Sequence, residues 1–304
     1  MYVATLIANP ERANLSSALA IQTAMKLGVQ GMVWLDENIA CDIEMVTFPT
    51  NTEVVWQELQ DQGIDFVIQP IDGRRKKILL ADMDSTMIRQ ECIDELAVEA
   101  GVGDHVAGIT ARAMNGELDF DDALRERVGL MKGLDSSVIK KVLDNRIDLM
   151  PGGVELVATM KASGAYTALV SGGFTDFTKA VAAALGFDEN RANTLLHKGG
   201  KLTGKVQMPI LGREAKVEAL HDVTTKLGVG VEDVIAVGDG ANDLGMLTLA
   251  GCGVALHAKP IVAAQCDVRL NNSDLTGLLY VQGYKQSDFV FPNGVSESWK
   301  HHDS

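Results

Sequence analysis

Residues 78–86 read Ile-Leu-Leu-Ala-Asp-Met-Asp-Ser-Thr, an apolar run that ends in two acids separated by a single residue. The consecutive apolar residues Ile78–Ala81 predict a short strand buried on both faces, as in a parallel sheet. Asp82 and Asp84 follow directly, and alternate side chains of an extended chain point to the same side. The two carboxylates are therefore expected to share one site at the end of this strand.

Two further apolar runs end in polar residues in the same way. Tyr166–Val170 is followed by Ser171-Gly172-Gly173, and Val234–Val237 is followed by Gly238-Asp239-Gly240-Ala241-Asn242-Asp243. Helical patterns come after both runs. Open α/β sheets bind their ligands beyond the carboxyl ends of the strands. We therefore predict the α/β class, with a doubly wound parallel sheet and a ligand site where these strands end.

Residues 88–150 lack strand patterns and are rich in helical ones, such as CIDELAVEAG and DALRERVGLMKG. This segment interrupts the predicted sheet right after its first strand, so we expect a helical cap over the ligand site. Residues 194–206, with two glycines at the centre, predict a hairpin. Residues 291–304 are expected to form a loose C-terminal tail.

The N-terminal residues show a different alternation: strand, helix, two strands, helix and strand. This order matches the split β-α-β of ferredoxin-like α+β domains, and it resembles an ACT-type regulatory domain. The basic run Arg74–Lys77 predicts a solvated joint after it. We thus expect a regulatory or dimerisation domain at 1–72 and a second domain, which contains the cap, at 73–290.

The composition excludes several classes of protein. The chain has 304 residues, of which 46% are hydrophobic and 22% charged, as in an ordinary folded protein. The formal net charge of −14 argues against nucleic acid or an anionic membrane as a partner. The four cysteines lack the spacing of a zinc site. Because we also find neither a secretory signal nor an apolar run of roughly 20 residues, we expect a cytoplasmic protein.

The acids at the strand ends favour a metal site. Like charges this close repel one another, and a cation between them lets them stay ionised. Carboxylate oxygens suit Mg²⁺, a hard ion that keeps several of its waters. Taken alone, an Asp-x-Asp is more often a helix cap followed by a solvated acid, and a Ser-Gly-Gly is more often only a tight turn. The combination indicates a phosphate site, in which a hydroxyl and loop amides bind the phosphoryl oxygens.

Four motifs in this order resemble those of the haloacid dehalogenase superfamily: Asp82-Met83-Asp84-Ser85-Thr86, Ser171-Gly172-Gly173, Lys216 and Gly238–Asp243. The cap, with Glu91–Glu95, Phe120 and Leu124–Val128, is similar to that of the phosphoserine phosphatases of this superfamily. The resemblance runs from about Lys76 into the 280s. It implies a Mg²⁺-dependent hydrolysis of phosphoserine through an aspartyl-phosphate, the last step of serine biosynthesis.

The resemblance also implies a role for each catalytic and metal-binding residue. Asp82 would be the nucleophile, and Asp84 would act as general acid and then as general base. The metal would be held by the Asp82 carboxylate, the Asp84 backbone carbonyl and Asp239, with Asp243 close by. Lys216 would balance the charge of Asp239 and help to bind the phosphoryl group.

The remaining residues would bind the substrate, a small molecule. Ser171, Gly172 and Asn242 would hold or position its phosphate. In the cap, Glu91 would meet its ammonium and Arg127 its carboxylate, while Phe120 would form an apolar wall. Without the resemblance, Glu91 would be interpreted as an acid at a helix start and Arg127 as a surface ion-pair partner.

Two other functions stay open. One is a phosphatase or phosphotransferase of the same superfamily that acts on another small phosphomonoester. The other is a serine-responsive regulatory module whose phosphatase part is inactive. The ACT resemblance further suggests a homodimer.

Overall fold

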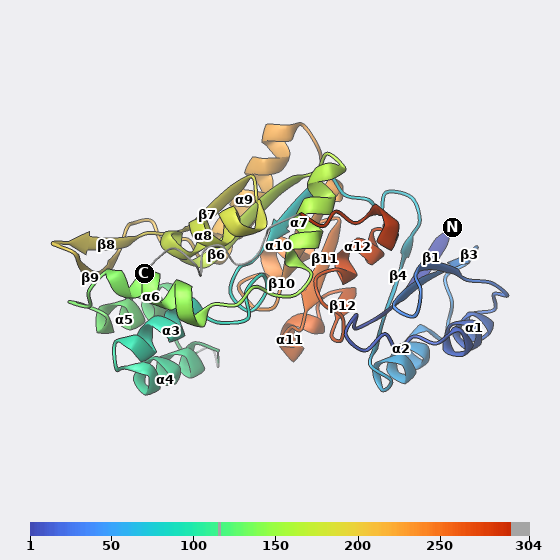
Figure 1. Ribbon diagram of the computed structural model, residues 1–304, viewed down its shortest axis with the longest axis horizontal. Helices are drawn as coiled ribbons and strands as arrows, with labels where there is room; N and C mark the ends of the chain where they lie inside the picture. Colours follow the sequence, from blue (N-terminus) through green and yellow to red (C-terminus); the bar gives the residue numbers. More distant parts are fainter. Residues whose placement is uncertain (115–116, 293–304) are drawn as a thin grey trace.

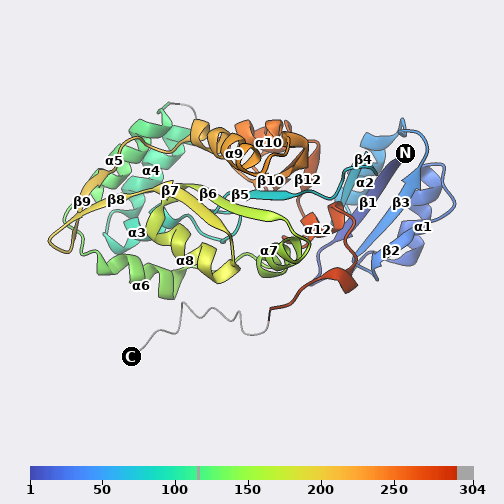
Figure 2. The ribbon, with the colours of Figure 1, turned by 90° about the horizontal axis from the view of Figure 1, so that it is seen from above.

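The computed structural model describes residues 1–114 and 117–292, so the predicted tail at 291–304 lies almost wholly outside this range (Figure 1). The strands of the described residues form three sheets, with four, six and two strands. The second view separates the N-terminal sheet, at one end of the molecule, from the long central sheet (Figure 2).

The N-terminal unit is a four-stranded antiparallel sheet with the strand order β2-β3-β1-β4. Its elements are β1 (Tyr2–Ala8), α1 (Ser17–Lys26), β2 (Val33–Asp36), β3 (Ala40–Met45), α2 (Thr52–Gln60) and β4 (Ile64–Pro70). Alternate residues of β1, such as Ala4 and Leu6, pack with the helices in one core. This order confirms the ferredoxin-like prediction, whereas the ACT likeness and the homodimer stay predictions.

The central sheet has six parallel strands in the order β12-β11-β10-β5-β6-β7. Its strands are β5 (Ile78–Ala81), β6 (Tyr166–Phe174), β7 (Glu189–Asn193), β10 (Val234–Gly238), β11 (Cys252–Leu256) and β12 (Val268–Leu270). In β5, Leu79 and Ala81 belong to one hydrophobic core, while Ile78 and Leu80 belong to the core on the other face. Such two-sided burial explains the uninterrupted apolar runs and confirms the doubly wound sheet.

Helices cover both faces of this sheet and form the cap. The helices beside the sheet are α7 (Gly153–Ala162), α8 (Thr175–Leu185), α9 (Arg213–Leu227), α10 (Leu244–Leu249), α11 (Pro260–Ala263) and α12 (Gly277–Val281). The cap consists of α3 (Cys92–Glu99), α4 (Gly103–Met114), α5 (Phe120–Leu130) and α6 (Ser137–Arg146). The predicted hairpin is β8 (Leu195–Lys198) with β9 (Lys201–Val206), and it lies beside the cap (Figure 1). The helical cap is therefore confirmed.

The register of the parallel strands brings the three motifs to one edge of the sheet. Ala81 of β5 lies opposite Val237 of β10 on one side and Leu169 of β6 on the other. The residues that follow these three positions therefore emerge at the same level.

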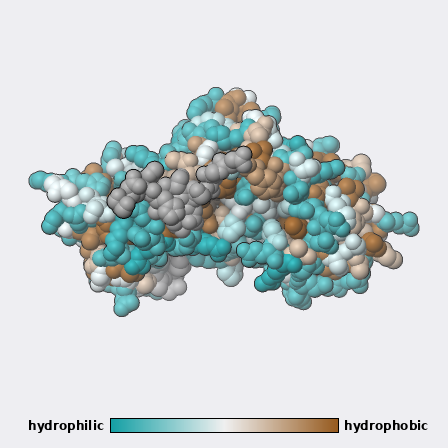
Figure 3. Space-filling model, in the orientation of Figure 1, coloured by the Kyte–Doolittle hydropathy of each residue, from teal (hydrophilic) through white to brown (hydrophobic). Residues whose placement is uncertain are grey.

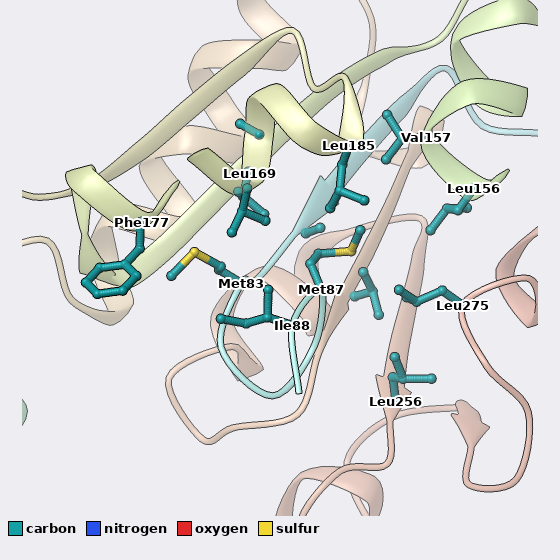
Figure 4. Packing of buried hydrophobic residues seen from close by; sticks show 14 of the residues in the cluster. Met83, Met87, Ile88, Leu156, Val157, Leu169, Phe177, Leu185, Leu256 and Leu275 are labelled. Carbon is teal, nitrogen blue, oxygen red and sulfur yellow. The ribbon is translucent and has the colours of Figure 1, made fainter. Parts of the chain in front are cut away.

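The loop after β5 is anchored by apolar side chains. Met83, Met87 and Ile88 point into a cluster formed with α7, α8, β6 and β11 (Figure 4). All three side chains are fully buried. The polar residues between them, including Asp82 and Asp84, are thereby held at the sheet edge.

The predicted joint is partly solvated, since the Arg75 and Lys77 side chains are exposed, but Arg74 also forms an ion pair with the N-terminal sheet. The Arg74 side chain is only 14% exposed and pairs with Asp42 of β3. The Arg75 guanidinium lies over the ring of Tyr284, and Tyr280 donates a hydrogen bond to Asp36. Elsewhere, the face of the molecule in Figure 3 carries scattered hydrophobic residues on a mostly hydrophilic surface. No helix among residues 1–114 and 117–292 is long and apolar enough to span a membrane.

Candidate active site

The ends of β5 and β10 place three carboxylates and one ammonium together. Asp82 follows β5, Asp239 and Asp243 follow β10, and Lys216 reaches them from the first turn of α9. Lys216 Nζ lies 2.7 Å from Asp82 Oδ1 and also contacts Asp243 Oδ1. Its side chain is 1% exposed, so this cation is enclosed by the acids that it neutralises.

The charges in this cluster do not balance. Burial, and then the neighbouring Asp243, raise the pKa of Asp239 to about 7. The same two causes raise the pKa of Asp82 well above its ordinary value, although Lys216 acts against them. Burial alone would lower the pKa of Lys216, but Asp243 and Asp82 hold it above its usual range. One buried lysine is thus shared among three acids, and the cluster lacks positive charge.

A divalent cation fits this arrangement. Carboxylate oxygens of Asp82, Asp239 and Asp243 lie within 4.8 Å of one another, and all three residues are buried. The donor set consists of hard oxygens, and the Thr86 hydroxyl donates a 3.3 Å hydrogen bond to one of them, Asp239 Oδ1. Both carboxylate oxygens of Asp243 already have partners: Oδ1 contacts Lys216, and Oδ2 accepts from the amides of Asp239 and Gly240.

The Asp84 side chain lies apart from this cluster. Its Oδ1 accepts from the Cys92 amide at 2.9 Å, and its Oδ2 accepts from the Ser171 hydroxyl at 3.1 Å. Burial, followed by the charge of Glu91, raises the pKa of Asp84 to about 6. A carboxyl group with this pKa can both hold and accept a proton near neutral pH. The proposed contact of its backbone carbonyl with a metal stays a prediction.

The loop after β6 lies close to Asp84. A Cβ atom at Gly173 would come within 2.7 Å of Asp84 Oδ2, so a larger residue would displace that carboxylate. The Gly173 amide donates to Ser171 Oγ at 2.8 Å, and Gly172 O accepts from Asn193 Nδ2 at 2.8 Å. A Cβ at Gly172 would lie 3.0 Å from the Phe120 ring of the cap. The absence of side chains thus lets cap and loop approach closely.

The cap and the sheet edge enclose a cavity of about 370 Å³. The predicted residues that line it are Asp82, Asp84, Glu91, Phe120, Arg127, Gly172, Asp239 and Asn242. Ser171, Lys216 and Asp243 are buried directly behind this lining. The structure therefore brings together all the residues that the sequence singled out.

Glu91 does not cap its helix and Arg127 is not a surface ion-pair partner, which were the interpretations without the resemblance. Glu91 precedes α3, but its side chain makes no capping hydrogen bond and instead accepts from the Ser85 hydroxyl at 2.7 Å. Arg127 donates to Ala123 O and, at 3.4 Å, to Thr110 Oγ1. Burial lowers the pKa of Arg127, while Asp94 and Glu91 raise it. Within the described residues the guanidinium has no ion pair, so it is available to an anionic ligand in the cavity.

Lys216 was expected to balance the charge of Asp239, and its charge does oppose the rise in the pKa of that acid that burial causes. Its direct contacts are with Asp82 and Asp243 instead. The physical reason lies in the first turn of α9, which packs against α10 and so faces the start of that helix, next to Asp243.

Several residues of the site were not predicted. Arg213 and Lys259 line the cavity, and Asn193 fixes the Gly172 loop by bonding both Gly172 O and Leu211 O. Arg213 lies three residues before Lys216, and Lys259 follows β11, the next strand beyond β10. The position of Lys259 just past a strand end was the one available signal, since ligands bind at that edge.

Comparisons with known proteins agree with this site. The family of haloacid dehalogenase-like hydrolases matches residues 79–248. The chain is 42% identical over 227 residues to a phosphoserine phosphatase of Archaeoglobus fulgidus; the match covers 74% of this chain and 66% of the relative. The chain thus spans slightly less than two thirds of that protein.

Two solved structures are similar over different parts of the chain. A HAD family hydrolase from Salmonella enterica has 30% identity and a TM-score of 0.81, and the match covers 92% of this chain and 97% of that one. A phosphoserine phosphatase solved as an analogue of its phospho-aspartyl intermediate has 41% identity and a TM-score of 0.64, with 68% of this chain and 98% of that one covered. The first match includes the N-terminal unit.

Proposed function

The chain belongs to the haloacid dehalogenase-like hydrolase family, and from this premise we propose that it hydrolyses O-phospho-L-serine to L-serine and phosphate. One observation carries the proposal. Asp82, which contacts Lys216, opens onto the same cavity as an acidic and a basic side chain of the cap, Glu91 and Arg127. The phosphoserine phosphatases among the relatives support the same substrate.

In the first half of the reaction, Asp82 attacks phosphorus and the bond from phosphorus to the serine oxygen breaks. Lys216 and the Met83 amide both contact Asp82 Oδ1, so Oδ2 is the oxygen that we assign to the attack. Asp84 delivers its proton to the departing serine oxygen. Its raised pKa supports this step, because part of the population is protonated near neutral pH.

In the second half, a water molecule attacks the phosphorus of the aspartyl-phosphate, and the bond to Asp82 breaks. Asp84, now ionised, accepts the proton of that water. The enzyme returns to its starting state with serine and phosphate released. Such covalent catalysis divides one difficult displacement into two easier ones.

We propose that Mg²⁺ is held by Asp82, the Asp84 carbonyl and Asp239, with Asp243 adjacent. When bound, it offsets the negative charge that develops on the phosphoryl oxygens. The excess of buried acids over Lys216 supports a cation at this position. Ser171, Gly172 and Asn242 then hold or position the phosphoryl group.

The cap supplies the specificity for the amino-acid part of the substrate. The Glu91 carboxylate pairs with the substrate ammonium, and the Arg127 guanidinium pairs with its carboxylate. Phe120, packed against Gly172, separates this pocket from water. A different phosphomonoester or an alcohol acceptor for the phosphoryl group remains the alternative, and these two charged residues disfavour it.

The first experiment measures phosphate release from phosphoserine with and without magnesium. We expect turnover with Mg²⁺, its loss after chelation and its recovery when Mg²⁺ is restored. Circular dichroism of the chelated protein controls for unfolding. Full turnover after chelation would refute the metal assignment. If phosphoserine is bound but never hydrolysed, the protein is a regulatory module instead.

A second experiment tests the role of Arg127. Because a charge-assisted contact contributes about 1.5–3 kcal/mol, we expect Arg127→Ala to raise KM for phosphoserine by roughly 10- to 100-fold. Activity on para-nitrophenyl phosphate, which lacks a carboxylate, should change less than about threefold. Arg125→Ala is the matched control, because Arg125 pairs with Asp121 and Asp122 on the outer side of the same helix. Equal losses on both substrates would contradict the assignment.

The location and the domain division belong to the same proposal. The four cysteines are buried and free of disulfides, which suits a reducing cytoplasm. The two separate sheets support a division into 1–72 and 73–290.

A further inference from the structure

Asn9, Gln60 and Asp65 of the N-terminal unit hydrogen-bond one loop of the catalytic part, and Asp65 supplies a buried carboxylate. Asp65 lies on β4 and is 0% exposed. Its Oδ1 accepts from the amides of Asn271 and Asn272 and from the Asn272 side chain, and its Oδ2 accepts from the amides of Asn272 and Ser273. The amides of three successive residues thus converge on one anion, an arrangement that fixes the loop after β12.

This loop is joined to the loop after β11. The His257 ring contacts Ser273 O through Nε2 at 2.8 Å, and the His257 amide donates to Leu270 O at 2.8 Å. His257 has a φ of 45°, a left-handed conformation that is unfavourable for a residue with a side chain and needs support from its surroundings. The contacts to Leu270 and Ser273 give that support.

The loop after β11 leads directly into the active-site cavity. The Lys259 amide donates to Asp239 O at 3.2 Å, and its side chain lines the cavity with Asp82 and Asp239. Among the part of the chain that the structure describes, Lys259 forms no ion pair. Its charge acts on Asp239, where it opposes the rise in pKa that burial causes, and its place in the cavity lining lets it also meet an anionic substrate. In Figure 1, α11 and β12, which flank these loops, lie on the side of the central sheet that faces α2 and β4.

The geometry points to Lys259 as a substrate-binding residue and to Asp65 as the positioning residue that sets it, through Ser273 and His257. This inference rests on the proposed function, because it assumes an anionic substrate in the cavity. The N-terminal unit is then part of the machinery that shapes the active site. Spatial connection alone does not establish coupling, so the test measures the coupling itself.

The test compares Asp65→Asn, Lys259→Met and the double variant in the full-length enzyme. We expect Lys259→Met to raise KM for phosphoserine roughly tenfold, because one charge-assisted contact is lost. An asparagine at position 65 keeps one acceptor and turns a donor toward the amides, so Asp65→Asn should raise KM several-fold with kcat unchanged within about twofold. The double variant should have the KM of Lys259→Met alone.

Asp42→Asn is the matched control. Asp42 is also buried in the N-terminal sheet, but it contacts Thr5 and Arg74 and no loop of the cavity. Its KM should equal that of the wild type. Hydrogen exchange should become faster in 257–260 and 271–273 for Asp65→Asn only. If Asp65→Asn does not fold, the KM of His257→Asn tests the coupling instead. Asparagine tolerates the left-handed conformation but is too short to reach Ser273 O.

Each outcome bears on the inference. An unchanged KM in folded Asp65→Asn or His257→Asn, or a multiplicative rise in the double variant, would overturn it. If the wild type cleaves para-nitrophenyl phosphate but not phosphoserine, the proposed substrate is wrong. The KM of the same variants for the aryl phosphate then tests the coupling. A wrong substrate and an absent coupling are therefore distinguishable.

Discussion

Asp82→Asn is expected to lower kcat for phosphoserine by about 10⁴-fold or more, because the amide cannot attack phosphorus. Binding should survive, since asparagine keeps an oxygen toward the proposed metal and the ammonium and carboxylate sites are untouched. Asparagine also removes one of the buried negative charges, which relieves repulsion within the cluster. Isothermal titration of phosphoserine into the variant should give an affinity within about tenfold of the wild-type KM.

Asp222→Asn is the control for this substitution. The Asp222 side chain is 64% exposed and pairs with Arg191, away from the cavity. Its kcat should equal that of the wild type. Turnover by Asp82→Asn within tenfold of the wild type would assign the nucleophile elsewhere.

Asp84→Asn has the second largest expected effect. The variant can neither protonate the serine oxygen nor activate water, and we expect a loss of about 10²- to 10⁴-fold on phosphoserine. Para-nitrophenolate leaves without a proton, so the first half-reaction should persist on the aryl phosphate. Stopped-flow absorbance should then record a burst of about one nitrophenolate per active site, followed by a slow steady state.

The absence of a burst would be informative. If Asp84→Asn loses activity on both substrates equally and shows no burst, then Asp84 acts before the chemical steps. It could do so by holding Ser171 and the Cys92 amide in place. Ser171→Ala separates these possibilities, because it removes the hydroxyl contact and leaves the proton carrier in place. That variant should show no burst and no dependence on the leaving group.

The sheet could be predicted because its strands are buried on both faces. Because both faces of β5 pack into a core, Ile78–Ala81 are apolar throughout. The first polar residue after them, Asp82, therefore marks the end of the strand. The N-terminal strand order was predictable for a related reason, since short alternating elements allow few arrangements. The cap helices followed from their helical periodicity.

The details of the charge cluster could not be predicted. Which acid Lys216 contacts depends on how α9 packs against α10, and no local pattern encodes that packing. Asn193 and Asp65 were missed for the same reason. Their partners, Leu211 for the first and Asn271–Ser273 for the second, lie in loops that are 18 and more than 200 residues further along the chain.

The basic run Arg74–Lys77 shows how composition misleads at an interface. Four successive cations suggest a solvated segment, but Arg74 pairs across the two units, and Lys76 and Lys77 bond Glu232 and Asp233 of the catalytic part. Arg74 reaches a buried acid of β3, and Arg75 covers an aromatic ring. Arginine suits this position, because its long apolar stem packs while its guanidinium binds.

The central claim is that Asp82 becomes phosphorylated during turnover. Acid quenching of the wild-type enzyme mixed with phosphoserine and Mg²⁺, followed by mass spectrometry of the digest, measures this directly. We predict a single added phosphoryl group on the peptide that contains Asp82, absent from Asp82→Asn. Phosphate release at the normal rate with no phosphorylated peptide, or with the group on another residue, would contradict the account.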